Sequence, residues 1–141
     1  MELDELIGTW RLCSFELRSD EGDCYHPYGE NPKGLLIYDK KGYMSGIMSK
    51  ADRPLLSTND LRQLSASEKL TMADNINAYA GRYTLLKDRI VHEIEVSLVQ
   101  NAVGTFEDRF YSCHDRRLVL SSNPVMISGK EFRYYITWER I

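Results

Sequence analysis

The 141-residue chain lacks long apolar runs, an excess of basic residues and paired cysteines, and each absence excludes a class of protein. No stretch approaches the roughly 18 consecutive apolar residues of a membrane-spanning helix, so we expect no membrane partner. The formal net charge of -3 disfavours a nucleic-acid partner, which would require concentrated Lys and Arg. The three cysteines form no Cys-x-x-Cys pair, which favours free thiols in a reducing compartment. We therefore predict a cytoplasmic protein.

Several catalytic and metal-binding motifs are also missing. There is no Gly-x-Ser-x-Gly elbow and no glycine-rich phosphate loop. His26, His92 and His114 stand far apart in the sequence, so we predict neither a metal site nor a cofactor. The acidic start, MELDEL, has neither the basic nor the apolar segment of a signal peptide, and we expect no secretion signal.

Short runs rich in β-branched and aromatic residues dominate the chain, and turn residues separate them. The length and the 43% hydrophobic content predict a single domain over residues 1–141. We predict eight strands, at residues 8–18, 34–38, 43–48, 81–86, 90–98, 105–113, 117–122 and 131–141. Most connections are hairpin-sized and contain Gly or Asp, which favours an up-and-down antiparallel order.

Two connections are longer than a hairpin turn. Residues 19–33 are polar and turn-rich, and we interpret them as a loop at one rim. Residues 49–78, between the third and fourth predicted strands, contain a helical insertion, because Ser65 and Glu68 have the spacing of a capping box. The narrow apolar stripe of this helix predicts that it lies across the barrel as a flap. Eight antiparallel strands can remove their exposed edges by closing into a barrel, so we predict an all-β, eight-stranded barrel.

Motifs at the two ends of the chain support closure. Gly8-Thr9-Trp10 opens the first predicted strand, and Trp138-Glu139-Arg140 closes the last. In a closed barrel these strands are neighbours, so the Arg140 guanidinium can lie on the Trp10 indole and seal one end.

These ends resemble the calycin arrangement of lipocalins, and motifs throughout the chain resemble the bacterial and fungal lipocalin-like domain family. The motifs are Asn31-Pro32-Lys33-Gly34, Gly42-Tyr43-Met44-Ser45, Tyr79-Ala80-Gly81-Arg82-Tyr83, His92 with Glu95 and Ser97, Arg109, and Leu118-Val119-Leu120-Ser121. The resemblance implies a small barrel with an internal cavity and leaves the activity open, because fold does not determine function.

The stretch Val91 to Ser97 places an ionisable residue on each face of a predicted strand. If the Ile94 face is lumenal, then His92 lies in the cavity beside Ile90, Val96 and Leu98. The opposite phase turns Glu93, Glu95 and Ser97 inward. His92 and Glu95 are therefore the candidate catalytic groups, and a His92 that is only satisfied by a neighbouring Tyr or Arg is the structural alternative.

Tyrosine and methionine are abundant and suit a cavity for a flat organic molecule. The predicted ligand-binding residues are Tyr38, Met44, Met48, Tyr79, Tyr83, Asp108, Phe110 and Tyr134. On alternation, Arg109 falls on the face opposite Asp108 and is expected outside. Three hypotheses follow: a barrel that binds a small apolar or aromatic molecule, a cofactor-independent isomerase or cyclase that uses the same cavity, and a filled barrel for protein interaction. A homo-oligomer is compatible with each of them.

Overall fold

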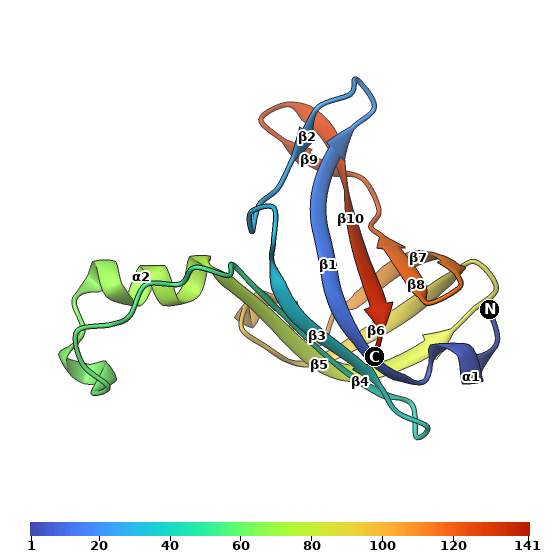
Figure 1. Cartoon of the computed structure of the whole chain (residues 1–141), viewed down its shortest axis with the longest axis horizontal. Coiled ribbons are helices and arrows are strands. Elements are labelled where there is room, and N and C mark those ends of the chain that lie inside the picture. The colour runs from blue at the N-terminus through green and yellow to red at the C-terminus, as the bar shows by residue number, and fades with distance from the viewer.

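The structure is a computed structural model that describes residues 1–141, and all of its strands belong to one antiparallel sheet (Figure 1). The long strands are β1 (Gly8–Ser19), β3 (Lys33–Tyr38), β4 (Tyr43–Ser49), β5 (Ile76–Leu85), β6 (Arg89–Ser97), β7 (Phe106–His114), β8 (Arg117–Ser121) and β10 (Lys130–Arg140). Two short strands, β2 (Cys24–Tyr25) and β9 (Val125–Ile127), extend β1 and β10. The helices are α1 (Leu3–Leu6) and α2 (Ala66–Asp74), with 3-10 turns η1 (Leu61–Gln63) and η2 (Gln100–Ala102).

The sheet closes because its first long strand pairs with its last. The long strands follow one another around the barrel as β1-β3-β4-β5-β6-β7-β8-β10, and β10 returns to β1 over a register that runs from Trp10 opposite Arg140 to Ser19 opposite Phe132. The predicted eight-stranded barrel is therefore confirmed. The sequence did not predict β2, β9 or the first five residues of β5.

One end of the barrel is sealed by the predicted pair of residues. The Arg140 guanidinium carbon lies 4.6 Å from the centre of the Trp10 ring. Arg140 Nη1 donates to the Ile7 carbonyl at 2.9 Å, and Nη2 donates to the Glu5 carbonyl. Trp10 is 1% exposed, and its indole N–H donates to the Leu6 carbonyl at 2.9 Å. The same two side chains thus pair the strand ends and fix α1 across the opening.

Gly8 is required at this seal for two reasons. Its φ of +140° lies in a region that side chains rarely adopt. A Cβ atom at this position would also lie 2.7 Å from Arg140 Nη1. The glycine therefore leaves the space in which the guanidinium reaches the backbone.

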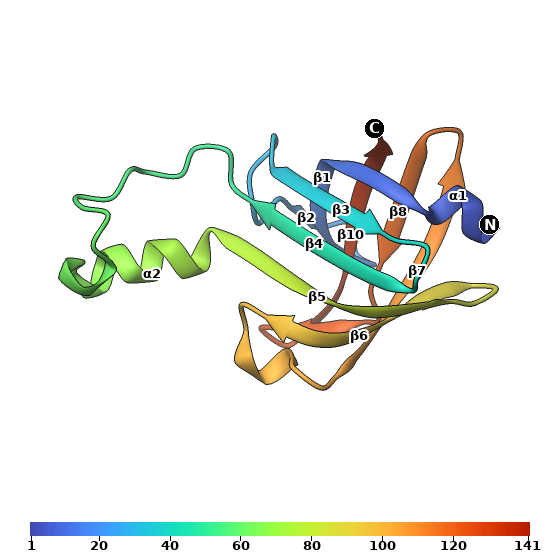
Figure 2. The same ribbon diagram turned by 90° about the horizontal axis from the view of Figure 1, so that it is seen from below.

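Residues 50–75 between β4 and β5 form an arm that points away from the barrel in both views (Figures 1 and 2). The capping box of Ser65 and Glu68 is present, but α2 buries none of its residues. Glu68 accepts from the backbone N–H and hydroxyl of Ser57, so the helix is tied to the preceding segment of the arm. The helix lies between the third and fourth long strands as predicted. The expectation that it lies across the barrel was wrong, because the arm carries the helix away from the barrel and Leu70 of its apolar stripe remains 62% exposed. No helix in the protein has the length and apolar character to cross a bilayer.

We expect Arg140→Ala to lower the free energy of unfolding by about 1–3 kcal/mol, because a desolvated cation–π contact is lost and two carbonyls lose their donor. Arg140→Lys should fall between the two proteins, since an ammonium keeps the charge without the planar fork. Urea unfolding measures both. Arg62→Ala is the matched control, because Arg62 forms only an exposed ion pair on the arm. Equal stability of Arg140→Ala and Arg62→Ala would contradict the proposed role of the seal.

Candidate functional site

The barrel encloses a cavity of about 350 Å³. This volume is near the lower end of the range for small-molecule sites, roughly 300–1,000 Å³. Its walls come from β1, β3, β4, β5, β6, β7, β8 and β10, and 11 of the 17 lining residues are hydrophobic. The exposed residues Pro27 and Asp74 mark its mouth, one from the loop after β2 and the other from the end of α2. A small organic molecule with limited polar surface fits these dimensions.

One wall is a stack of three aromatic rings. Phe15 lies between Tyr28 and Tyr134, with ring centres 5.1 and 5.3 Å apart and interplanar angles of 29° and 16°. Phe15 and Tyr134 point inward from β1 and β10, while Tyr28 comes from the loop. Offset ring stacking of this kind offers a flat apolar surface to a planar ligand.

His92 lies inside the barrel between two tyrosines. Its Nε2 is 2.7 Å from the Tyr38 hydroxyl, and its Nδ1 is 2.6 Å from the Tyr79 hydroxyl. Burial, and secondarily the charge of Arg109, lowers the pKa of His92 from 6.5 to about 3. The imidazole is therefore neutral at physiological pH and carries one N–H.

A neutral imidazole between two hydroxyls can donate to one tyrosine and accept from the other. The Tyr38 hydroxyl is fully buried and has no other partner, so we assign it as the donor to Nε2. The N–H at Nδ1 then donates to the Tyr79 oxygen. Tyr79 lines the cavity, and its own hydroxyl proton remains free for a ligand. Burial raises the pKa of both tyrosines, which keeps these protons in place near neutral pH.

Arg109 brings a positive charge to the cavity from β7. Its side chain is only 15% exposed, and its Nη1 lies 3.1 Å from Glu107 Oε2. Although burial lowers the pKa of Arg109, Tyr79 and Glu107 outweigh this and raise it, so the guanidinium stays charged. Hydrogen bonding to Arg109 in turn opposes the burial effect on Tyr79.

One buried donor near the cavity has no partner in the protein. The Trp138 indole N–H is buried without an acceptor, and Trp138 lines the cavity. An unsatisfied buried donor costs roughly 1–3 kcal/mol. Among the lining residues, Tyr79 and Arg109 offer donors that suit a ligand that carries an acceptor oxygen.

The structure resolves the phase of β6. Ile90, His92 and Ile94 point inward and are buried, whereas Glu93 and Glu95 are exposed. The alternative that turned Glu95 into the cavity is therefore wrong.

The inward face is shorter than predicted, because Val96 is 67% exposed and Leu98 is 42% exposed. Gly81 pairs with Ile94 and Ala80 pairs with Val96, so Glu95 is an extra residue that forms a β-bulge. The bulge reverses the alternation beyond it.

Five of the predicted site residues line the cavity together: Met44, Met48, Tyr79, His92 and Tyr134. Tyr38 is not among the lining residues, and its hydroxyl is hydrogen-bonded to His92 Nε2. Tyr83 is buried against Tyr38 with ring centres 4.8 Å apart, and its hydroxyl donates to the Asp39 carbonyl at 2.6 Å. Tyr83 is thus part of the packed base below the cavity.

Asp108 and Phe110 were expected in the cavity and lie outside it. Asp108 Oδ1 is 3.2 Å from Arg89 Nε, and the Arg89 guanidinium carbon lies 5.9 Å from the centre of the Phe110 ring. The ion pair with Arg89 balances the charge of the Asp108 carboxylate on the outer face. Because Ile90 pairs with Arg109 and Val91 with Asp108, it is Arg109 that shares the inward face of β6. The register between β6 and β7, which decides which residues of β7 point inward, could not be predicted from the sequence.

This geometry defines a closed β-barrel with an internal, ligand-sized cavity and a polar base. A family model described as a lipocalin-like domain matches residues 7–141, and the chain belongs to that family.

A relative with a curated name is the 4'-hydroxy-3'-methoxypropiophenone carrier protein of Aspergillus oryzae. It is 34% identical over 73 residues, which cover 45% of this chain and 66% of the relative. The match thus spans just under two thirds of the relative's length. No solved structure matches the chain.

We expect the free energy of unfolding to fall more steeply with decreasing pH in the wild type than in His92→Gln. Between pH 6.5 and about 3 the unfolded chain protonates His92 and the folded protein does not. The stability from the neutral imidazole is therefore complete above pH 6.5 and is lost on acidification, by up to about 1.4 kcal/mol per pH unit.

Urea unfolding at pH 7, 6, 5 and 4.5 measures this difference. Both proteins carry the same carboxylates, so the gap between their stabilities should narrow as the pH falls. A constant gap would show that His92 titrates normally in the folded protein.

Proposed function

We propose that this barrel binds a small aromatic molecule that carries a carbonyl or similar acceptor oxygen. The observation that carries the proposal is the position of the Tyr79 hydroxyl, which belongs to a lining residue and lies 2.6 Å from His92 Nδ1. With the tautomer assigned above, its oxygen accepts from His92 and its proton is free for a ligand. Arg109 is a second donor among the residues that line the cavity.

The aromatic part of the ligand follows from the rings that line the cavity. The stack of Tyr28, Phe15 and Tyr134 offers ring faces, and Met44 and Met48 line the same cavity with flexible thioethers. Because the volume is about 350 Å³, we infer a ligand with one or two rings and no long acyl chain.

The relative's name supports the same chemistry. It describes a carrier for a phenolic aryl ketone, a flat molecule with a carbonyl, a hydroxyl and a methoxy oxygen. We propose aryl ketones as the first ligand class for this protein, which would make it a binding or carrier protein.

An isomerase or cyclase remains the second hypothesis, but the two predicted catalytic groups do not favour it. Glu95 is exposed on the outer face. Both nitrogens of His92 are engaged by tyrosines, and its pKa of about 3 makes it a poor base near neutral pH. The cavity itself counts against a filled barrel.

We expect an aryl ketone such as 4'-hydroxy-3'-methoxypropiophenone to bind, and Tyr79→Phe to weaken binding about tenfold. The variant keeps the ring and removes the hydroxyl, and one hydrogen bond contributes about 1.4 kcal/mol. Isothermal titration calorimetry measures the affinity. The analogue in which a methylene replaces the carbonyl should bind wild type and Tyr79→Phe equally.

Tyr135→Phe is the matched control, because Tyr135 points outward, where Arg18 lies over its ring at 4.5 Å. It should leave the affinity unchanged. If Tyr79→Phe and Tyr135→Phe bind the ketone equally well, then Tyr79 does not recognise the carbonyl.

A further inference from the structure

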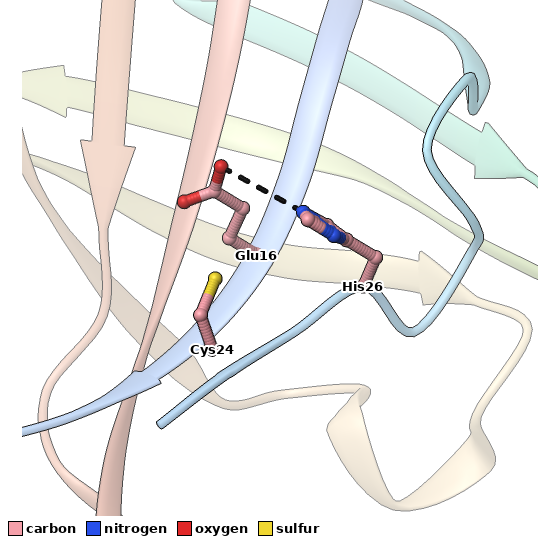
Figure 3. Close-up of side chains that lie close together, drawn as sticks. All are labelled: Glu16, Cys24 and His26. Carbon is pink, nitrogen blue, oxygen red and sulfur yellow. Dashed lines mark ion pairs between the residues drawn. The ribbon is translucent and has the colours of Figure 1, made fainter. Parts of the chain in front are cut away.

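Three potential metal ligands converge on the outer face of the barrel, away from the cavity (Figure 3). A carboxylate oxygen of Glu16, Cys24 Sγ and a ring nitrogen of His26 all lie within 4.8 Å of one another. Glu16 Oε1 is 3.9 Å from His26 Nε2.

The pairing of β1 with β2 produces this arrangement. Arg18 pairs with Cys24 and Leu17 with Tyr25, so the two antiparallel strands place Glu16 beside the chain at His26. Alternate residues of a strand share a face, and Cys24 and His26 therefore point to the same side as Glu16. Because β2 has only two residues, it has no detectable strand pattern, and residues 19–33 were interpreted as a loop.

We propose that Glu16, Cys24 and His26 form a binding site for Zn²⁺, with water in the fourth position. Thiolate, imidazole and carboxylate are the three side-chain ligands that zinc prefers. In a tetrahedral zinc site, ligand atoms lie roughly 3.3–3.7 Å apart, given bond lengths of about 2.0–2.3 Å. The three ligand atoms here lie within 4.8 Å of one another, and none of the three side chains is buried in the core. Side-chain rotations can therefore bring the atoms to the distances of a zinc site.

Arg18 holds Glu16 in a suitable position. Arg18 Nε donates to Glu16 Oε2 at 2.6 Å, while Oε1 faces His26. The guanidinium also lies over the Tyr135 ring at 4.5 Å, which fixes it on the far side of the carboxylate. It would act as the outer partner that orients a ligating carboxylate.

Binding displaces one proton and transfers no electrons. The Cys24 thiol loses its proton to solvent as the Sγ–Zn²⁺ bond forms, while neutral His26 and ionised Glu16 each donate a lone pair. Water completes the coordination.

The metal would connect the loop to the barrel wall. His26 directly precedes Pro27 and Tyr28, which line the cavity, and its carbonyl accepts from the Gly29 N–H at 3.0 Å. Tyr28 in turn stacks on Phe15. A zinc ion that joins His26 to Glu16 would therefore fix the loop that carries Tyr28 to β1. This metal site does not depend on the identity of the ligand in the cavity.

Co²⁺ titration of the metal-free protein tests the site, because a Co²⁺–thiolate bond gives a charge-transfer band in the near ultraviolet and a tetrahedral site gives visible bands. We expect one equivalent to bind and Zn²⁺ to displace it. Cys24→Ser should abolish the charge-transfer band. His26→Gln and Glu16→Gln should each weaken binding by at least 10–100-fold, the loss that even an outer-sphere partner can cause.

His114→Gln is the matched control, since His114 is an exposed histidine paired only with Asp115. It should bind Co²⁺ as the wild type does. Circular dichroism in EDTA checks that each variant is folded. Absence of a thiolate band at saturating Co²⁺, or unchanged affinity in folded Cys24→Ser and His26→Gln, would overturn the proposal.

Hydrogen exchange provides a second measurement. With Zn²⁺, backbone amides of residues 24–29 should exchange more slowly in the wild type and in His114→Gln, and not in His26→Gln. Equal exchange with and without Zn²⁺ in the wild type would refute the connection between the metal and the loop.

Discussion

The pairing of β1 with β10 is the interaction on which the rest of the structure depends. It converts an open sheet into a barrel and so creates an interior that strands from the whole sheet enclose. Arg140 completes the closure by bridging the Trp10 ring and the backbone of the segment that precedes β1. Since this seal closes one end, a ligand has to enter at the other, where Pro27 and Asp74 mark the mouth.

Closure also explains the chemistry of the cavity. An imidazole in water would exchange its partners freely, but inside the barrel His92 is desolvated and held between Tyr38 and Tyr79. In its neutral state the imidazole donates one hydrogen bond and accepts one, and with Tyr38 assigned as the donor the Tyr79 proton is left unpaired. In the proposed function, His92 would therefore act as a positioning residue through the Tyr79 hydroxyl rather than as a catalyst.

The sequence predicted those features that depend on local patterns. The strand alternation, the tight turns and the capping box of Ser65 each follow from residues whose preferences need no distant partner. The contact between Trp10 and Arg140 followed from the prediction of a closed barrel, in which the first and last strands are neighbours. The lumenal placement of His92 and Ile94 was one of two phases that alternation left open.

Features that depend on register were not predictable in the same way. Arg109 was assigned to the wrong face because β6 and β7 are joined by a longer segment that contains η2, and no tight turn fixes their pairing. The bulge at Glu95 depends on Gly81, where a Cβ atom would lie 1.9 Å from the Glu93 carbonyl oxygen. The pair of strands that gathers Glu16, Cys24 and His26 is too short to have a pattern.

The arm has a consequence for how the protein can vary. The Lys50 N–H donates to the Asn75 carbonyl at 3.0 Å, so the chain leaves β4 and re-enters β5 through adjacent positions. The excursion is therefore modular: its length and composition can diverge among descendants without altering the strand pairing around the barrel. Of the arm, only Asp74 borders the mouth of the cavity. Divergence of the arm would therefore change which molecules can enter and would leave the rest of the cavity lining unchanged.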